Sequence, residues 1–274
     1  MAQVKIGIRY ERRGDGGFMK MDLNSDMGES FGAYKLGLDE EVIKFITSAN
    51  IACGWHAGDP LVMRKTIQMA KENGVAVGAH PGFPDLLGFG RRNMDCTQEE
   101  LRDYMIYQIG AIQAFAKALG TKVEHFKSHG SLALMSFEDD KIATPIAEAI
   151  ASVDPNLIWI VLGGVKGRMM TEVGKKVGLR VAYEGFPDRA YTPDGTLVSR
   201  RQPGAVIKDP EVVAERAWVM TKGKVIAVDG REIPLDIHTL CVHGDTPGAI
   251  HLVKRIREKL TAEKVELVPV RKIL

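Results

Sequence analysis

Short apolar runs alternate with longer amphipathic stretches along the whole chain. Most of the runs end in Gly, His or Asp, and the stretches between them repeat their apolar residues with helical spacing. Near-continuous apolar runs are typical of parallel strands that are buried on both faces. The pattern therefore predicts seven strand–helix units in one parallel sheet with helices outside it. The predicted strands are residues 18–26, 48–54, 75–80, 123–130, 156–164, 179–186 and 237–245.

The helical stretches carry signals at their ends. Asp59 and Pro60 cap and begin one helix, and Thr97 with Glu100 three residues later forms a capping box at another. An Asp-Gly turn inside residues 224–235 predicts a hairpin. The predicted helices are residues 39–49, 60–74, 97–120, 138–153, 168–178, 209–223 and 246–260.

Seven such units favour closure into an α/β barrel, a (β/α)7 TIM-like barrel, although an open doubly wound sheet also fits the pattern. No linker or shift in composition divides residues 19–274, which we expect to form one domain. Residues 1–18 are predicted to be an N-terminal extension without a function of their own. They have no continuous apolar segment of the kind that a secretory signal needs.

Composition narrows the class of protein. The chain has 274 residues, is 45% hydrophobic and 26% charged, and carries a formal net charge of +2. This balance gives no indication of binding to nucleic acid or to a membrane, and no apolar run approaches the roughly 20 residues of a membrane span. Three widely spaced cysteines predict reduced thiols and a cytoplasmic protein.

Candidate chemistry gathers where the predicted strands end. Parallel barrels carry their active sites at the carboxyl ends of the strands, so polar residues there should converge on one mouth. Six of the seven runs are followed by ionisable side chains, and turns alone do not require histidine at four of them. These polar residues are Asp22, Asn24, Asp26, Glu29, His56, Asp59, His80, Asp85, Lys127, His129, Glu184, Asp188, Arg189, His243 and Asp245.

Two kinds of hydrolytic chemistry fit these residues. The four histidines and nearby carboxylates suit a divalent metal such as Zn, Mn or Fe, although no closely spaced ligand motif supports one. Without a metal, a carboxylate or histidine would activate water while Lys127 or Arg189 stabilised negative charge. Cys53 beside His56 is a less favoured nucleophile, because a small buried residue at a strand end is commoner.

Two long loops add basic residues. Residues 80–92 include the pair Arg91 and Arg92, which suits binding of a carboxylate or phosphate, and residues 187–207 similarly include Arg189, Arg200 and Arg201. Together the loops are predicted to form a lid over the mouth. The chain contains no P-loop motif.

The sequence resembles the LamB/YcsF family, the family of 5-oxoprolinase A subunits. The resemblance rests on "DLNSDMGESFG", "NIACGWHAGDP", "GAHPGFPDLLGFGRR", "FPDRAYTPDGTLVSRRQPGAVI" and "CVHGD", and it covers nearly the whole chain from Met19. In a further motif, "FKSHGSLAL" stands where the family has a sequence like "VKPHGALYN", so that Ala133 and Leu134 replace a Tyr-Asn pair. Pro187 similarly replaces an alanine.

This resemblance implies a (β/α)7 barrel of the glycoside hydrolase/deacetylase type. It also implies an ATP-dependent hydrolase, with Mg accompanying the nucleotide, that opens 5-oxo-L-proline to L-glutamate together with partner subunits B and C. The alternatives are a metal-dependent deacetylase or amidohydrolase acting on a related lactam or amide, and a non-catalytic small-molecule-binding protein.

On the 5-oxoprolinase hypothesis, roles can be assigned to the residues of the mouth. We expect Asp22 or Asp188 to act as the base and Lys127 with Arg189 as the anion clamp. The expected catalytic residues are Asp22, His56, His129, Asp188 and Lys127, and the expected substrate-binding residues are Asn24, His80, Arg91, Arg189, His243 and Asp245.

Overall fold

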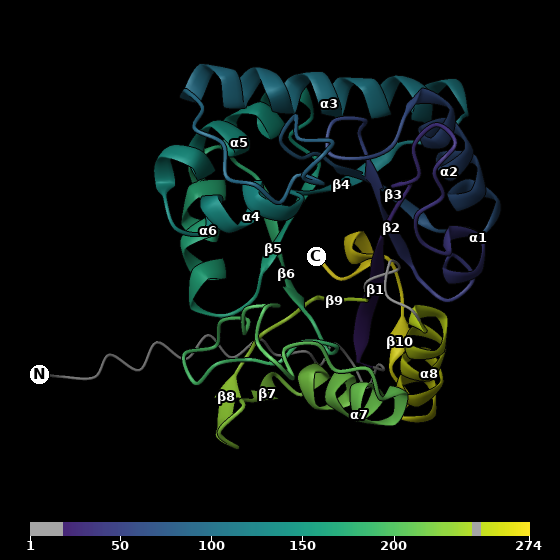
Figure 1. Cartoon of the computed structure of the whole chain (residues 1–274), viewed down its shortest axis with the longest axis vertical. Helices are drawn as coiled ribbons and strands as arrows, with labels where there is room; N and C mark the ends of the chain where they lie inside the picture. Colours follow the sequence, from purple (N-terminus) through teal and green to yellow (C-terminus); the bar gives the residue numbers. More distant parts are fainter. Residues whose placement is uncertain (1–18, 243–247) are drawn as a thin grey trace, which may run out of the picture.

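A closed ring of seven parallel strands forms the centre of the protein (Figure 1). The structure, a computed structural model, describes residues 19–242 and 248–274. The ring closes because β1 pairs with both β2 and β9, with Asp22 opposite Thr239 in the second pairing. This confirms the barrel and excludes the open sheet. The strands are β1 (Lys20–Met27), β2 (Ser48–Ala52), β3 (Ala76–His80), β4 (Val123–Lys127), β5 (Ile158–Leu162), β6 (Arg180–Gly185) and β9 (Thr239–Cys241).

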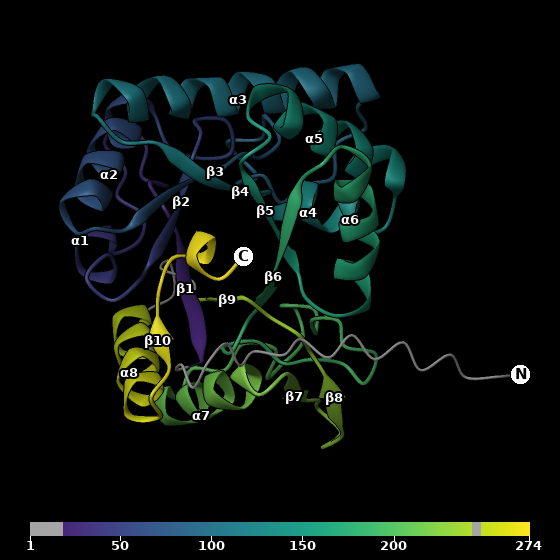
Figure 2. The same ribbon diagram turned by 180° about the vertical axis from the view of Figure 1, so that it is seen from behind.

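The helices surround this ring on its outside, as Figures 1 and 2 show from opposite sides. The first is shorter than the predicted 39–49, because the chain must enter β2 at Ser48. The fourth was not predicted as a separate element and begins directly after His129. The helices are α1 (Asp39–Val42), α2 (Pro60–Glu72), α3 (Gln98–Ala118), α4 (Gly130–Ser136), α5 (Asp140–Val153), α6 (Val165–Lys176), α7 (Pro210–Thr221) and α8 (Ala249–Ala262).

Local signals at the ends of these elements behave as the sequence predicts. Asp59 accepts hydrogen bonds from the backbone of the first turn of α2, and the capping box of Thr97 and Glu100 begins α3. The hairpin is also confirmed, since β7 (Lys224–Ile226) and β8 (Glu232–Pro234) pair antiparallel.

The C-terminal segment covers the amino end of the barrel. There, β10 (Glu266–Leu267) pairs with the first residues of β1, and the 3₁₀ helix η1 (Val270–Lys272) follows. Val270 packs on Ile158, Ile160 and Ala182, and in both views this segment lies at the centre of the ring. Neither short element was predicted. The opposite, carboxyl end of the barrel is left for a functional site.

The main apolar core lies between the ring and the helices, whereas much of the barrel interior is polar. Among the described residues, none of the helices is both long and apolar enough to cross a membrane. The predicted extension, residues 1–18, lies outside the described residues.

Candidate functional site

A cavity of about 610 Å³ opens at the carboxyl ends of the strands. This volume lies within the usual range for sites that bind small molecules. Four strands each contribute a charged or titratable residue to its wall, and both long loops contribute arginines, so the two loops line one cavity as predicted. These residues are Asp26, His80, Lys127, Glu184, Arg91, Arg189, Arg200 and Arg201.

Lys127 lies between two carboxylates at the floor of this cavity. Its Nζ donates to Asp26 Oδ1 and lies the same distance, 2.9 Å, from Glu184 Oε1. It also donates to Cys241 Sγ at 3.2 Å. Burial disfavours the charged ammonium, but Asp26, Cys241 and Glu184 outweigh that cost and raise the pKa of Lys127 well above its ordinary value. The floor therefore holds a fixed positive charge.

A network of amides inside the barrel supports this group. Asn50 Nδ2 donates to Asp26 Oδ1 at 2.8 Å, and Asn24 Nδ2 donates to Glu184 Oε1 at 3.0 Å. Asn50 Nδ2 also donates to Asn24 Oδ1 at 2.7 Å, which links the two carboxylates. Buried polar networks of this kind fix side-chain orientation when every member is satisfied. Asn24, predicted to bind substrate, thus lies beneath the cavity and holds Glu184.

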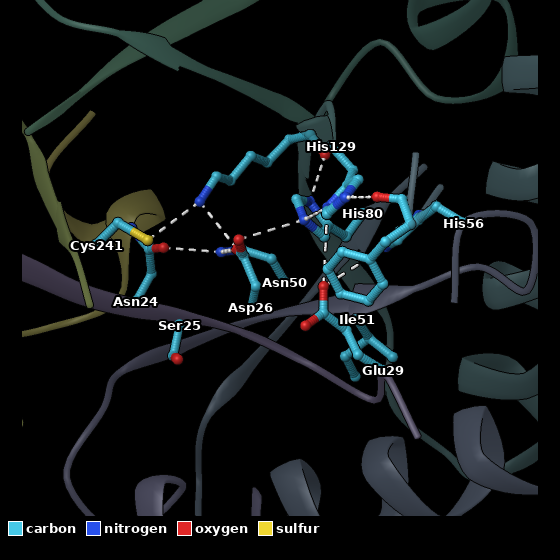
Figure 3. Close-up of polar contacts among 12 residues, drawn as sticks. Asn24, Ser25, Asp26, Glu29, Asn50, Ile51, His56, His80, His129 and Cys241 are labelled. Carbon is cyan, nitrogen blue, oxygen red and sulfur yellow. Dashed lines mark hydrogen bonds and ion pairs between the residues drawn. The ribbon is translucent and has the colours of Figure 1, made fainter. Parts of the chain in front are cut away.

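Three histidines and a glutamate form a second, adjoining group (Figure 3). His129 Nδ1 lies 3.0 Å from His80 Nε2, and Glu29 Oε1 lies 3.6 Å from His56 Nε2 and 3.7 Å from His129 Nδ1. Gly90 makes this packing possible, since a Cβ there would come within 2.7 Å of His56 Cβ. We call Glu29, His56, His80 and His129 the histidine cluster.

The electrostatics of the histidine cluster favour neutral rings at His56 and His129. Burial lowers the pKa of His129 to about 3, helped by the neighbouring His80, and burial together with both other rings lowers the pKa of His56 well below its ordinary value. Neutral imidazole and carboxylate are ligands that suit Zn, Mn, Fe or Co. One ligand atom from each of the four residues lies within 4.8 Å of all the others, so the histidine cluster has the residues to hold a metal.

Asp22 lies deeper than expected. It is four residues before Asp26 on β1, which places it roughly 13 Å further down the strand at about 3.3 Å per residue. Its carboxylate accepts hydrogen bonds from Thr47, Ser48 and Thr239, and burial raises its pKa to about 6. Asp22 therefore does not line the cavity, and Asp26 occupies the carboxyl end of the strand in its place.

Other predicted residues also serve the framework. Arg189 lines the cavity, but its guanidinium donates to the carbonyl oxygens of Val198 and Ala205 and so holds the loop 187–207. Asp188 is buried at the start of the same loop and does not line the cavity. His243 and Asp245 lie outside the described residues.

Cys53 lies in surroundings that disfavour a thiolate. It is buried and donates to the carbonyl oxygen of Ile51, and burial raises its pKa to about 12. A nucleophilic cysteine needs the opposite shift. The structure therefore favours a structural role for Cys53 over a nucleophile beside His56.

The strand-end pattern includes Asp26, Glu29 and Glu184 among the polar residues of the mouth, but no role is predicted for them from the sequence. Asp26 could have been preferred to Asp22 on geometry, because only the last inward-facing residue of a barrel strand reaches the mouth. No motif or spacing identifies Asn50 or His125, whose ring nitrogen Nε2 lies 2.8 Å from Asn50 Oδ1. The motif departures Ala133 and Leu134 both line the cavity.

Comparison with known proteins gives concordant matches. Residues 21–274 match the model of the LamB/YcsF family. The chain is 56% identical over 250 residues to the 5-oxoprolinase A subunit of Alkaliphilus metalliredigens, covering 91% of this chain and 96% of that protein. It is 55% identical over 252 residues to the protein of the same name from Pyrococcus furiosus, covering 92% and 98%. The crystal structure of a lactam utilization protein from Thermus thermophilus superposes with a TM-score of 0.86 at 46% identity, covering 91% and 99%.

Proposed function

Because the chain belongs to the LamB/YcsF family, we propose that it is the A subunit of a 5-oxoprolinase. Such an enzyme hydrolyses the lactam ring of 5-oxo-L-proline to L-glutamate. The observation that carries the proposal is the shared name of relatives that match this chain over nearly its whole length. The basic cavity at the barrel mouth is the place in this chain that suits the substrate.

The charges of the cavity suit a small anionic lactam. 5-Oxoproline carries one carboxylate on a five-membered ring, and the cavity volume of about 610 Å³ accommodates it with space left over. In this proposal Arg91 and Arg200, one from each long loop, bind the carboxylate, because a guanidinium pairs with a carboxylate in a bidentate manner. The amide then faces Lys127 at the floor.

Opening the ring requires activation, because a lactam is an unactivated amide. In this proposal the amide oxygen takes the γ-phosphoryl group of ATP and ADP leaves. One water then attacks the ring carbon, the C–N bond breaks and the nitrogen takes a proton, which leaves an acyl phosphate. A second water hydrolyses this acyl phosphate, and phosphate departs. The products are glutamate, ADP and phosphate.

Two residues on the floor have direct roles in this scheme. The ammonium of Lys127 stabilises the charge that develops on the amide oxygen. Asp26, which lies beside Lys127 and His80, accepts the proton of the attacking water. Asp22 and Asp188 lie away from the cavity wall and act as positioning residues.

The nucleotide has two candidate locations. Since the sequence has no P-loop, ATP with Mg is bound either by the arginines of this cavity or by one of the partner subunits, B or C. Calorimetric titration of the isolated chain with ATP and Mg distinguishes the two, because only the first location gives binding without partners.

The decisive experiment is an assay of glutamate release from 5-oxoproline, with and without ATP, for the chain alone and with its B and C subunits. We expect release only with ATP and both partners, and at least a 100-fold loss for Asp26→Asn, as is typical when a general base is removed. No release with partners that are active beside another A subunit would refute the substrate. Release without ATP or partners would instead favour the amidohydrolase alternative.

A further inference from the structure

The hydrogen bonds of two rings in the histidine cluster fix where their protons are. His80 Nδ1 lies 2.8 Å from the carbonyl oxygen of Lys127, and His129 Nε2 lies 2.8 Å from the carbonyl oxygen of Phe89. A carbonyl oxygen only accepts, so both nitrogens carry hydrogen. When neither ring carries a second proton, His80 Nε2 and His129 Nδ1 keep their lone pairs, and the two nitrogens face one another at 3.0 Å. Two lone pairs at this distance repel unless a proton or a metal ion lies between them.

Two carboxylates lie close to these nitrogens (Figure 3). Glu29 Oε1 lies 3.7 Å from His129 Nδ1, and Asp26 Oδ2 lies 3.4 Å from His80 Nε2. Around a tetrahedral ion with bonds of about 2.1 Å, neighbouring ligand atoms are roughly 3.4 Å apart. The four ligand atoms of the histidine cluster lie within 4.8 Å of one another, so some of them must move closer to surround an ion.

His56 supplies an independent observation. Its side chain is fully buried, and neither ring nitrogen has a hydrogen-bond partner among the described residues. Such groups are rare in proteins and call for an explanation. The ring stacks on that of His129 with centroids 3.7 Å apart and planes 4° from parallel, so one of them must turn before both bind one ion in plane. His56 can turn without breaking any hydrogen bond to its ring.

We propose that Glu29, His56, His80 and His129 bind one divalent transition-metal ion of the Zn, Mn, Fe or Co class. A metal-bound histidine typically donates its other ring N–H to a backbone carbonyl or carboxylate, as His80 and His129 do here. Nitrogen-rich ligand sets favour these metals over Mg or Ca. Because His80 and His129 also line the cavity, the ion is reachable by a bound substrate. The site goes beyond the proposed function, which names no such ion.

The test is direct metal binding by the full chain, without substrate, nucleotide or partner subunits. Chelator-treated protein is titrated with Zn²⁺ or Co²⁺ by calorimetry, with Mg²⁺ as the comparison metal, and the absorption spectrum of bound Co²⁺ reports nitrogen ligation. We expect one equivalent to bind. His80→Ala and His129→Ala should weaken binding by more than the roughly 10- to 100-fold that loss of a ligand's hydrogen-bond partner costs.

Two further variants keep the result interpretable. Glu29→Gln preserves shape, so a loss of affinity in a variant with wild-type circular dichroism reports ligation rather than folding. His238→Gln is the matched control, because His238 is buried just before β9, outside the histidine cluster, where it accepts from the backbone of Tyr183. Unchanged binding in this control supports the site. Absence of stoichiometric binding in wild type, or equal affinity in all ligand variants, would overturn it.

Discussion

Replacing Lys127 by methionine tests the charge arrangement at the floor of the cavity. The side chain is 8% exposed and lies 2.9 Å from a carboxylate oxygen of both Asp26 and Glu184. At an effective dielectric constant of 20, each contact is worth roughly 6 kcal/mol before the cost of burial. Loss of one partner of such a buried pair typically costs about 3–5 kcal/mol, since the remaining charge is uncompensated.

We therefore expect Lys127→Met to lower the free energy of unfolding by about 3–5 kcal/mol, measured by urea denaturation at pH 8 and followed by circular dichroism. The loss should be smaller at pH 5. Without the ammonium, the folded-state pKa of Glu184 lies still further above its unfolded value, so its stabilising contribution is present at low pH and lost as pH rises.

A double variant separates charge from packing. Adding Glu184→Gln to Lys127→Met removes one of the two uncompensated carboxylates and should recover part of the loss, giving a coupling free energy above about 1 kcal/mol. The exposed Lys141→Met serves as the control and should change stability by no more than about 0.5 kcal/mol. Additive losses in the double variant, or the same deficit at pH 5 and pH 8, would refute the charge argument.

Three further predictions concern residues that the sequence singled out. Burial raises the pKa of Asp22 from 3.8 to about 6, so the stabilising contribution of this group is lost as pH rises through that interval. Asp22→Asn should therefore flatten the dependence of the unfolding free energy on pH between those values. An unchanged slope in the variant would contradict this. Native protein should resist thiol reagents at Cys53 and react first at the half-buried Cys96. Peptide mass spectrometry locates the modified cysteine. Rapid modification of Cys53 would show that this thiol is accessible to the reagent. Asp59→Ala should destabilise the protein by about 1–2 kcal/mol in thermal or urea melts, because the carboxylate caps α2 and also accepts a hydrogen bond from the backbone of Gly32. A loss below about 0.3 kcal/mol would mean that the cap contributes little.

The seven-strand barrel could be predicted because its signals are local. Each buried strand is an apolar run, and each helix has its own period and caps, so order and parallel direction follow without long-range information. The C-terminal β10 and η1 were missed because two or three residues show no period, and only contact with β1 and the barrel interior defines them.

Depth along a strand could not be predicted in the same way. Alternation places Asp22, Asn24 and Asp26 on one face, and the structure confirms that all three point into the barrel network. How far each lies from the mouth depends on the register between β1 and β9, which joins residues far apart in sequence. The sequence predicts that His80 and His129 converge at the mouth. It does not predict how their rings are oriented, because the rings bond to backbone carbonyl groups, which every residue type has.

The pairing of β1 with β9 also has a consequence for folding during synthesis on the ribosome. The hydrogen bond from Thr239 to Asp22 joins residues 217 positions apart, and β10 pairs with β1 from still later in the chain. At a translation rate of roughly 5–20 residues per second, about 10–40 s pass before that partner emerges. During this interval one edge of β1 is unpaired, and the carboxylate of Asp22, which is buried in the folded protein, is exposed to water. An open strand edge can pair with other chains. Slower translation should therefore lengthen exposure of the nascent barrel, and its yield should depend on chaperones that bind it before the ring closes.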